Sequence, residues 1–361
     1  MPAILERKSY PMEITFLDFI SELSIYTPLI FTTLLTLGVI LVNGWTDAPN
    51  AISTCVSTRA MQPGSAIFMA AVFNLFGVVA MTMVNQKVAE TIYNMVDFQG
   101  NVNDALVALC AALTAIVLWA TAAWAFGIPT SESHALIAGL SGAAIALQGG
   151  FSGINGSEWI KVLYGLVLST ALGFVMGFLA VKLVELLFRN MNLHKSSRFF
   201  GKAQIISAAG MAFMHGAQDG QKFIGIFLLG MFLAKGQTQN AEVVIPVWLM
   251  ILCAAVMGLG TSIGGYRIIK SVGMDMVKLK KYQGFSADLA GGICLFLSTA
   301  SGIPVSTTHT KTTAIMGVGA AKNIKNVNLG IVREMVLTWV LTFPCCGLVG
   351  YLMAKLFIWI F

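Results

Sequence analysis

Two copies of one short string hold most of the residues that could bind a ligand. Residues 127–134, the first string, read Gly-Ile-Pro-Thr-Ser-Glu-Ser-His, and residues 302–309, the second string, read Gly-Ile-Pro-Val-Ser-Thr-Thr-His. Each string follows one apolar run and opens the next. Proline fits the first turn of a helix, and serine or threonine beside it caps free backbone N–H groups. Each string therefore predicts a helix with a hydroxyl-rich N-terminus.

Such helix N-termini inside a membrane would be suited to hold an anion. Each exposes about four unpaired N–H donors and the positive end of the helix dipole. The hydroxyls that would add further donors belong to Thr130, Ser131, Ser133, Ser306, Thr307 and Thr308. Two such ends that meet from opposite sides would form a site for a small tetrahedral oxyanion. The alternative is that the strings only cap helices, but their repetition at matched spacing favours a ligand site.

A histidine closes each string, at His134 and His309. A histidine within a membrane can relay protons or bind a metal ion. It can also hold a helix break in place by a hydrogen bond to a backbone carbonyl, and we favour this structural role for both residues.

A second duplicated element lies upstream of each string and carries an aspartate, Asp47 or Asp219. Both lie in apolar runs, where an unpaired charge is expensive. Gly44 and Gly216 precede them by three residues and would permit an unwound turn. Carboxylate oxygens, the Asn50 amide and freed carbonyl oxygens would together suit Na⁺ or a shared proton. We therefore expect anion and cation to bind together, as in a symporter; the alternative is a pair of structural N-caps.

Three further charged residues lie in these segments. Lys222 takes the position in the second copy that Asn50 has in the first, and it could pair with Asp219, contact the anion or take the place of a cation. Lys311 and Glu132 lie in or beside apolar runs, where they would either snorkel to the interface or pair internally.

The composition indicates an integral membrane protein. The 361 residues are 57% hydrophobic and 11% charged, with a mean hydropathy of +0.80, whereas soluble domains carry about 25% charged residues. The net charge of +6 is expected to report membrane orientation, and we expect no nucleic-acid partner. Apolar runs predict about ten crossings, at residues 28–58, 63–84, 105–126, 129–147, 160–188, 203–234, 243–263, 284–301, 303–320 and 335–360.

Some of these runs are irregular. The first and sixth are over-long and are expected to be interrupted at the aspartates, and 129–147 and 303–320 are short enough to be re-entrant. Residues 12–24 predict a short helix on the membrane surface.

The spacing of the elements predicts an internal duplication. Asp219 follows Asp47 by 172 positions, and His309 follows His134 by 175. Basic residues concentrate in 189–202, 264–281 and 321–333, which places these segments in the cytoplasm and both termini outside. Five crossings per half then insert the second half in the opposite sense, as in inverted-topology repeats. The predicted segments are an interfacial stretch at 1–27, a first half at 28–188, a basic cytoplasmic linker at 189–202 and a second half at 203–361.

These motifs resemble the inorganic phosphate transporter (PiT) family, from about residue 28 to the end. The elements that carry the resemblance are Gly44 to Asn50 with Pro129 to His134, and His215 to Asp219 with Pro304 to His309. The resemblance implies an all-helical phosphate/cation symporter, usually dimeric. The short 189–202 segment is similar to the bacterial and archaeal members, which lack the long central loop of animal members.

The resemblance also implies roles for individual residues. The phosphate contacts would be Asp47, Asn50, Thr130, Ser131, Ser133, Asp219, Ser306, Thr307 and Thr308. Lys222 is added to this set as a candidate contact because it takes the position of Asn50. The coupling cation would be held by Asp47, Asn50, Asp219 and Gln218. Thr46 and Gln218 stand where the family often has asparagine, and Lys222 replaces the second asparagine. The Gln221-Lys222 pair resembles the bacterial branch, in which proton coupling or uptake of a neutral metal–phosphate complex is expected.

The predicted function is therefore import of inorganic phosphate across a prokaryotic cell membrane by alternating access, driven by H⁺ or Na⁺. We expect no enzyme activity, no cofactor, and no metal other than Na⁺. A sulfate permease is the nearest alternative, but phosphate carries a proton that can be donated to a carboxylate. An intramembrane hydrolase could use two buried aspartates or a Ser-His pair. However, serine and histidine recur symmetrically in both halves, the aspartates do not lie in one local motif, and an enzyme rarely needs two equivalent sets. A passive channel would show neither saturation nor dependence on an ion gradient.

Overall fold

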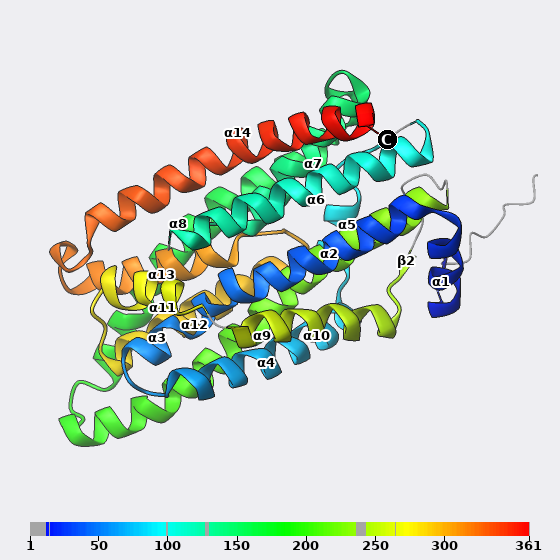
Figure 1. Ribbon diagram of the computed structural model, residues 1–361. Coiled ribbons are helices and arrows are strands. Elements are labelled where there is room, and N and C mark those ends of the chain that lie inside the picture. Colours follow the sequence, from blue (N-terminus) through cyan, green and yellow to red (C-terminus); the bar gives the residue numbers. More distant parts are fainter. Residues whose placement is uncertain are drawn as a thin grey trace, which may run out of the picture.

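The fold was analysed in a computed structural model, which describes residues 12–13, 15–98, 100–126, 130–235, 243–263 and 265–360. Figure 1 shows long helices that run roughly along one direction, with the short helix α1 (Phe16–Ile25) lying across one end. The strands β1 (Met12–Glu13) and β2 (Val243–Val244) pair in parallel near α1. The all-helical fold class is confirmed in its main feature, since these two-residue strands contribute little.

The order of elements in the second half follows that in the first. The first half contains α2 (Thr27–Thr46), α3 (Ala48–Ser57), α4 (Pro63–Val84), α5 (Lys87–Tyr93), α6 (Val102–Ala125), α7 (Glu132–Gln148), the 3₁₀ turn η1 (Phe151–Gly153) and α8 (Gly156–Leu187). The second contains α9 (Leu193–Ala234), α10 (Val247–Ile263), α11 (Tyr266–Lys270), the π-helical η2 (Ser271–Asp275), α12 (Lys281–Ala300), α13 (Thr307–Lys322), the 3₁₀ turn η3 (Ile324–Asn326) and α14 (Leu329–Ile360).

The two halves interlock through their helices. Helices α13 and α14 of the second half pack against α8 and α7 of the first, and α9 and α10 pack against α4 and α2. Glycines allow these close approaches. A Cβ on Gly44 would lie 2.5 Å from the Met257 carbonyl oxygen, and one on Gly216 would lie 2.2 Å from that of Asn74. Because both glycines lie within helices, the unwound turn predicted for them is wrong, and their role is close helix packing.

The two long apolar runs behave differently at their aspartates. The first is interrupted as predicted, because α2 ends at Thr46 and α3 begins at Ala48. The interruption predicted for the other run is wrong, since α9 continues through Asp219 as one helix of 42 residues. Pro49 explains the difference: it lies in the first turn of α3 and lacks the N–H that a continuous helix needs. At the corresponding position α9 has Gln221, which continues the helix.

The membrane-spanning capacity of the helices supports a multi-pass protein. Among the described residues, the helical segments that are long and apolar enough to cross a membrane are Thr27–Ser57, Pro63–Val84, Val102–Ala125, Gly156–Leu187 and Leu329–Ile360. A pair bent by 68°, Val247–Ile263 with Tyr266–Asp275, would make a sixth. The predicted total of about ten crossings remains a prediction. Helices α7 and α13 have 17 and 16 residues, or about 25 Å, which is shorter than the roughly 30 Å hydrocarbon core.

The two segments predicted to lie outside the repeats are also visible. The short N-terminal helix is confirmed as α1, which Phe19 anchors with ring contacts to Phe227 at 5.1 Å and Trp248 at 5.3 Å. Its position on a membrane surface stays a prediction. Most of the predicted linker at 189–202 belongs to α9, which already begins at Leu193.

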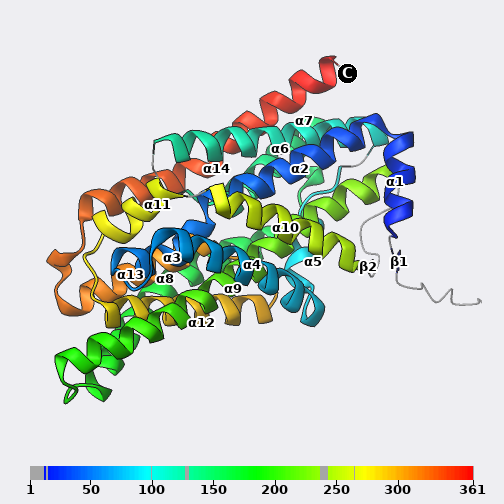
Figure 2. The same cartoon turned by 60° about the horizontal axis from the view of Figure 1, so that its bottom comes forward.

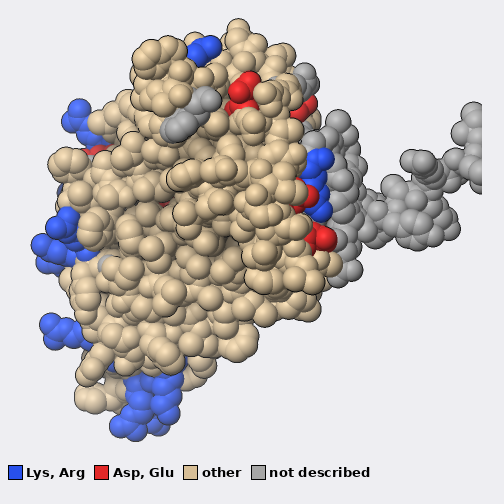
Figure 3. Space-filling model, turned by 45° about the vertical axis from the view of Figure 1, so that its right-hand side comes forward, with Lys and Arg blue, Asp and Glu red and all other residues tan. Residues whose placement is uncertain are grey.

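Charge is distributed unevenly over the surface. Lys and Arg gather mostly at one end, and much of the remaining face in view carries no charge (Figure 3). Exposed basic side chains from the segments predicted to be cytoplasmic include Lys195, Arg198, Lys202, Lys270, Lys278, Lys280, Lys322 and Lys325. This pattern is typical of a membrane protein that obeys the positive-inside rule.

Candidate functional site

The N-termini of α7 and α13 meet at the centre of the bundle. Ser131 caps α7 by accepting a hydrogen bond from the His134 amide at 3.3 Å, and Ser306 caps α13 by accepting one from the His309 amide at 3.1 Å. The two imidazole rings lie 4.4 Å apart. From this point the helices extend toward opposite ends of the bundle (Figure 1). The two positive helix ends therefore face one buried region, which is the arrangement that favours an anion.

The two histidines pack among aromatic rings of α14. His134 stacks on Phe343 at 4.8 Å, and His309 lies 3.7 Å from the Trp339 ring centroid. Neither nitrogen of His309 has a hydrogen-bond partner within the described part of the chain, so the carbonyl bond predicted for it is wrong. Both rings are buried inside the protein and fix how the two helix ends meet.

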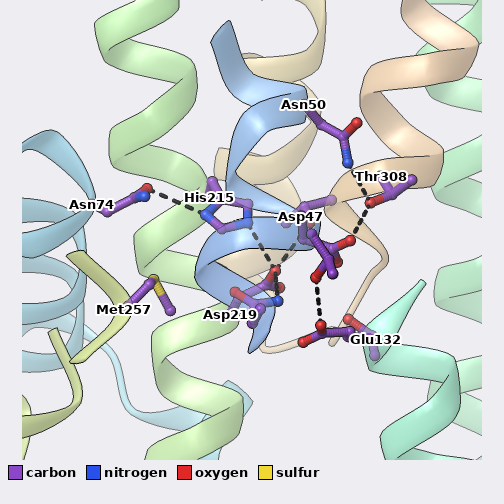
Figure 4. A network of polar contacts seen from close by, with 12 residues as sticks. Asp47, Asn50, Asn74, Glu132, His215, Asp219, Met257 and Thr308 are labelled. Atoms are coloured by element: carbon purple, nitrogen blue, oxygen red, sulfur yellow. Dashed lines mark hydrogen bonds and ion pairs between the residues drawn. The ribbon is translucent and has the colours of Figure 1, made fainter. Parts of the chain in front are cut away.

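The first aspartate is joined to the second string. Thr308 Oγ1 donates a hydrogen bond to Asp47 Oδ1 at 3.0 Å and accepts one from Asn50 Nδ2 at 2.8 Å (Figure 4). Asp47 does not cap α3 with its side chain, which argues against a purely structural N-cap. Asp47 Oδ2 and Asn50 Oδ1 are buried and have no donor among the described residues. Unpaired buried oxygens are rare in folded proteins and call for a water, ion or ligand.

The second aspartate is joined to the first string through Lys222. Lys222 Nζ donates hydrogen bonds to Asp219 Oδ1, Ser133 Oγ and the Val305 carbonyl oxygen, each at 2.6 Å. Ser133 is the counterpart of Thr308 in the two strings, and Lys222 is the counterpart of Asn50. Asp47 therefore bonds directly to a hydroxyl of the other half of the chain, and Asp219 is linked to one through the Lys222 ammonium.

The other oxygen of Asp219 is also well supplied with donors. Thr307 Oγ1 donates to Asp219 Oδ2 at 3.0 Å and Asn43 Nδ2 donates at 3.3 Å, while His215 Nε2 lies 3.2 Å away. His215 Nδ1 is in turn 3.2 Å from Asn74 Oδ1 (Figure 4). Asp219 thus has a charged partner and several polar ones, whereas Asp47 has hydroxyl contact alone.

Glu132 adds a second carboxylate on the side of Asp47. It is the first residue of α7 and is buried, and Thr46 Oγ1 donates a hydrogen bond to its Oε1 at 2.5 Å. Its Oε2 has no donor in the described structure, and no ion pair there includes either Glu132 or Asp47. Glu132 therefore does not snorkel to an interface. Two neighbouring carboxylates without a cation leave this region short of positive charge.

Two predicted ligands make other contacts. Thr130 Oγ1 accepts from Trp119 Nε1 at 3.2 Å and lies 3.3 Å from Thr342 Oγ1, so it is tied to α6 and α14 and not to the aspartates. Gln218 Nε2 donates to the Ile303 carbonyl oxygen at 3.1 Å, and its Oε1 is unpartnered among the described residues. Gly127 to Pro129 of the first string lie outside the described residues.

A second buried ion pair lies outside the meeting point of the helix ends. Lys311 Nζ bonds to Asp288 on α12, and both side chains are fully buried. Thr54 Oγ1 donates to Asp288 Oδ1 at 2.6 Å, and Ser207 Oγ donates to its other oxygen at 3.3 Å. Of the two interpretations of Lys311, internal pairing is correct. The sequence reasoning missed Asp288, although Lys311 in an apolar run already required an acidic partner.

The sequence reasoning also missed Asn43, which could have been found from its position in the duplicated element. It opens the first aspartate element at the position that His215 has in the second, and both side chains contact Asp219. Among the described residues no three His, Cys, Asp or Glu side chains converge on a position for a metal ion.

Two helix N-termini, several hydroxyls and two buried aspartates meet inside a multi-pass helical bundle, an arrangement typical of a membrane transporter for a small anion. Comparison with known proteins identifies the family: the chain belongs to the phosphate transporter family, whose model matches residues 43–350. It is therefore a transporter, and the hydrolase alternative is excluded.

Relatives cover most of the chain. It is 41% identical over 309 residues to a Bacillus subtilis (strain 168) protein named "Probable low-affinity inorganic phosphate transporter", spanning 86% of this chain and 91% of the relative. A protein of the same name from Rhizobium meliloti (strain 1021) is 40% identical over 311 residues, with the same two shares. A solved structure titled "The sodium-dependent phosphate transporter" shares the fold, with a TM-score of 0.85 at 23% identity over 93% of this chain and 100% of that one.

Proposed function

We propose that this protein is a secondary active symporter that imports inorganic phosphate across the prokaryotic cell membrane. The observation that carries the proposal is the meeting of the α7 and α13 N-termini, with their hydroxyls linked to both aspartates. The names of the relatives support phosphate as the anion.

Alternating access would use two inverted repeats, residues 28–188 and 203–361. Two features support this proposal. Helices α7 and α13 leave the site in opposite directions. Asp47 bonds to the Thr308 hydroxyl of the second half, and Asp219 is linked through Lys222 to the Ser133 hydroxyl of the first half. The site residues are buried in this structure, so neither side has access. Rocking one assembly against the other would expose the same residues first to one side and then to the other.

The arrangement of donors and acceptors favours phosphate over sulfate. Ser133 accepts a bond from Lys222, so its own hydroxyl proton is available to an anion, as are first-turn N–H groups of both helices. Asp47 Oδ2 and Glu132 Oε2 are acceptors without donors in the described structure. A protonated phosphate can donate to such a carboxylate, whereas sulfate at neutral pH cannot.

The coupling cation would bind beside Asp47. Buried side-chain oxygens without a donor among the described residues are Asn43 Oδ1, Asp47 Oδ2, Asn50 Oδ1 and Glu132 Oε2. Carboxylate and amide oxygens suit Na⁺, and the carboxylates equally suit a proton. The fold neighbour is titled sodium-dependent, which supports Na⁺. A cation here would offset the two unpaired carboxylates and allow the anion to approach, which couples the two ligands.

Uptake of labelled phosphate into proteoliposomes tests this function. We expect saturable uptake driven by an imposed Na⁺ gradient or by a pH gradient alone, and the comparison identifies the ion. Asp47→Asn should abolish coupled uptake, whereas Asp104→Asn at the exposed start of α6 should not change it. Arsenate should compete and sulfate should not; the reverse pattern would show that the anion is not phosphate.

We also propose a homodimer, because the family resemblance implies one. Light scattering from the purified protein in detergent would measure the mass of the complex. A mass of one 38.6 kDa chain, after correction for detergent, would contradict this assignment.

A further inference from the structure

We propose that Lys222 is a built-in cation, which permanently occupies the position that a second coupling cation would take. The inference rests on the proposed symport function and deepens it. It predicts that the transporter carries one cation fewer per phosphate than it would with asparagine at residue 222, the residue type that the first half has at Asn50.

The three acceptors around the Lys222 ammonium form a set of cation ligands. Nζ lies 2.6 Å from a carboxylate oxygen of Asp219, a hydroxyl oxygen of Ser133 and the main-chain carbonyl oxygen of Val305. Carboxylate, hydroxyl and free carbonyl oxygens at the start of a broken helix are the ligands that transporters use for Na⁺. The ammonium has three donors and no acceptor, so these three bonds use it fully.

This saturation decides between the three interpretations of Lys222. Because every N–H of the ammonium already has a partner, none is left to bind the anion directly. The side chain is 1% exposed, so it cannot turn to solvent. Lys222 therefore pairs with Asp219 and, through the Ser133 and Val305 oxygens, fills the space in which a free cation would be coordinated.

The first half shows what the same position does without the ammonium. There Asn50 donates to Thr308, and Asn50 Oδ1 and Asp47 Oδ2 remain without a donor among the described residues. In the second half, both oxygens of Asp219 have partners. One half thus keeps an unfilled set of oxygens for a mobile cation, while the other carries its positive charge on the chain itself.

Replacing Lys222 by asparagine, K222N, tests the assignment. The labelled probe is Na⁺ alone, bound at equilibrium to the purified protein without phosphate. We expect wild type to bind at most one Na⁺ per chain and K222N to bind one more. In proteoliposomes, the ratio of labelled Na⁺ to labelled phosphate should rise by one, and the apparent reaction order in Na⁺ should rise by one as well.

Further variants separate charge from side-chain shape. K222M removes the ammonium and offers no oxygen, so it should bind no additional Na⁺ and should lose uptake by about tenfold or more, because Asp219 is left unpaired. K222Q carries the same amide as K222N on a longer chain and provides a second route if K222N does not fold. Gln221→Asn, at a neighbouring α9 position that bonds the Asn85 carbonyl, should keep the wild-type Na⁺ count.

The outcomes are distinct from those of the proposed function. If wild type transports no phosphate, the symport proposal fails, yet the Na⁺ count of K222N still tests Lys222. Two Na⁺ bound per wild-type chain would overturn the inference without any variant. An unchanged Na⁺ count in folded K222N, or full uptake by K222M, would overturn it as well.

Discussion

Replacing Lys311 by methionine, K311M, should destabilise the protein strongly. Lys311 and Asp288 are paired with 0% side-chain exposure on both sides, between α12 and α13. Methionine fills a similar volume but leaves the Asp288 carboxylate with only the Thr54 and Ser207 hydroxyls. Breaking a buried pair by removing one partner typically costs about 3–5 kcal/mol, because a buried charge is left uncompensated.

The double variant K311M/D288L separates charge compensation from packing. A buried ion pair can often be replaced by apolar residues at little cost. The Thr54 and Ser207 hydroxyls would lose one acceptor, which costs about 1–2 kcal/mol in all. Ser207 can still donate to the Gln204 carbonyl oxygen, which limits this loss. We therefore expect the double variant to recover roughly half or more of the stability that K311M loses.

Equilibrium unfolding of the purified protein in detergent measures these differences. The matched control is Lys182→Met, whose partner Glu185 lies 3.9 Å away with both side chains substantially exposed. Such a surface pair contributes about 0–1 kcal/mol, so this control should stay near wild type. If K311M is as stable as wild type, or if the double variant is no more stable than K311M, the charge-compensation argument is refuted.

Three other predictions concern packing, the site and pH. A Cβ on Gly317 would lie 2.0 Å from the Phe174 carbonyl oxygen, so Gly317→Ala should force α13 and α8 apart and cost about 1–3 kcal/mol in equilibrium unfolding. A Cβ on Gly38 would meet nothing within 4 Å, so Gly38→Ala should be neutral in the same assay. Thr308→Val removes the hydroxyl that bridges to the first aspartate, so phosphate binding should weaken by about tenfold or more, and unchanged affinity would contradict that contact. Hydrogen bonds from Thr15 lower the pKa of Asp18, so the stabilisation of α1 is present above the unfolded pKa of about 3.9 and is lost as pH falls through the lower folded pKa. Hydrogen exchange of the α1 amides should therefore accelerate as the pH falls through this range, and Thr15→Ala should remove this pH dependence.

Much of the fold could be predicted from local patterns. Apolar runs indicated the helices, and the over-long first run was expected to break at its aspartate, which it does between Thr46 and Ala48. The same reasoning failed at Asp219 because it treated the two aspartate elements as equivalent. The second lacks the proline, so α9 remains continuous. The glycines beside both aspartates were assigned to unwound turns, since a sequence does not show which neighbouring helix approaches a residue.

Part of the candidate site could likewise be predicted from the sequence, and part could not. The duplicated strings and aspartates were sufficient to predict an anion site built by two helix N-termini. Pairing between distant residues was not predictable: Asn43 with Asp219, Thr46 with Glu132 and Lys311 with Asp288 are each separated by at least 23 positions. Such partners are chosen by how helices from the two halves cross, which depends on packing over the whole bundle.

The amino-acid sequence by itself determined the membrane class, the duplicated elements and the residue types that we propose bind an anion and a cation. These properties follow from composition and short-range spacing, which do not depend on the final arrangement of helices. Only the tertiary structure decided which carboxylates are neutralised. The Lys222–Asp219 pair lies within one turn of α9 and was one interpretation of the sequence, but its selection depends on the Ser133 and Val305 oxygens that packing brings to the ammonium. The same packing leaves Asp47 and Glu132 without a positive partner in the described structure. Long-range packing sets that balance of charge, because a buried carboxylate is stabilised only by groups that the fold brings within a few ångströms of it.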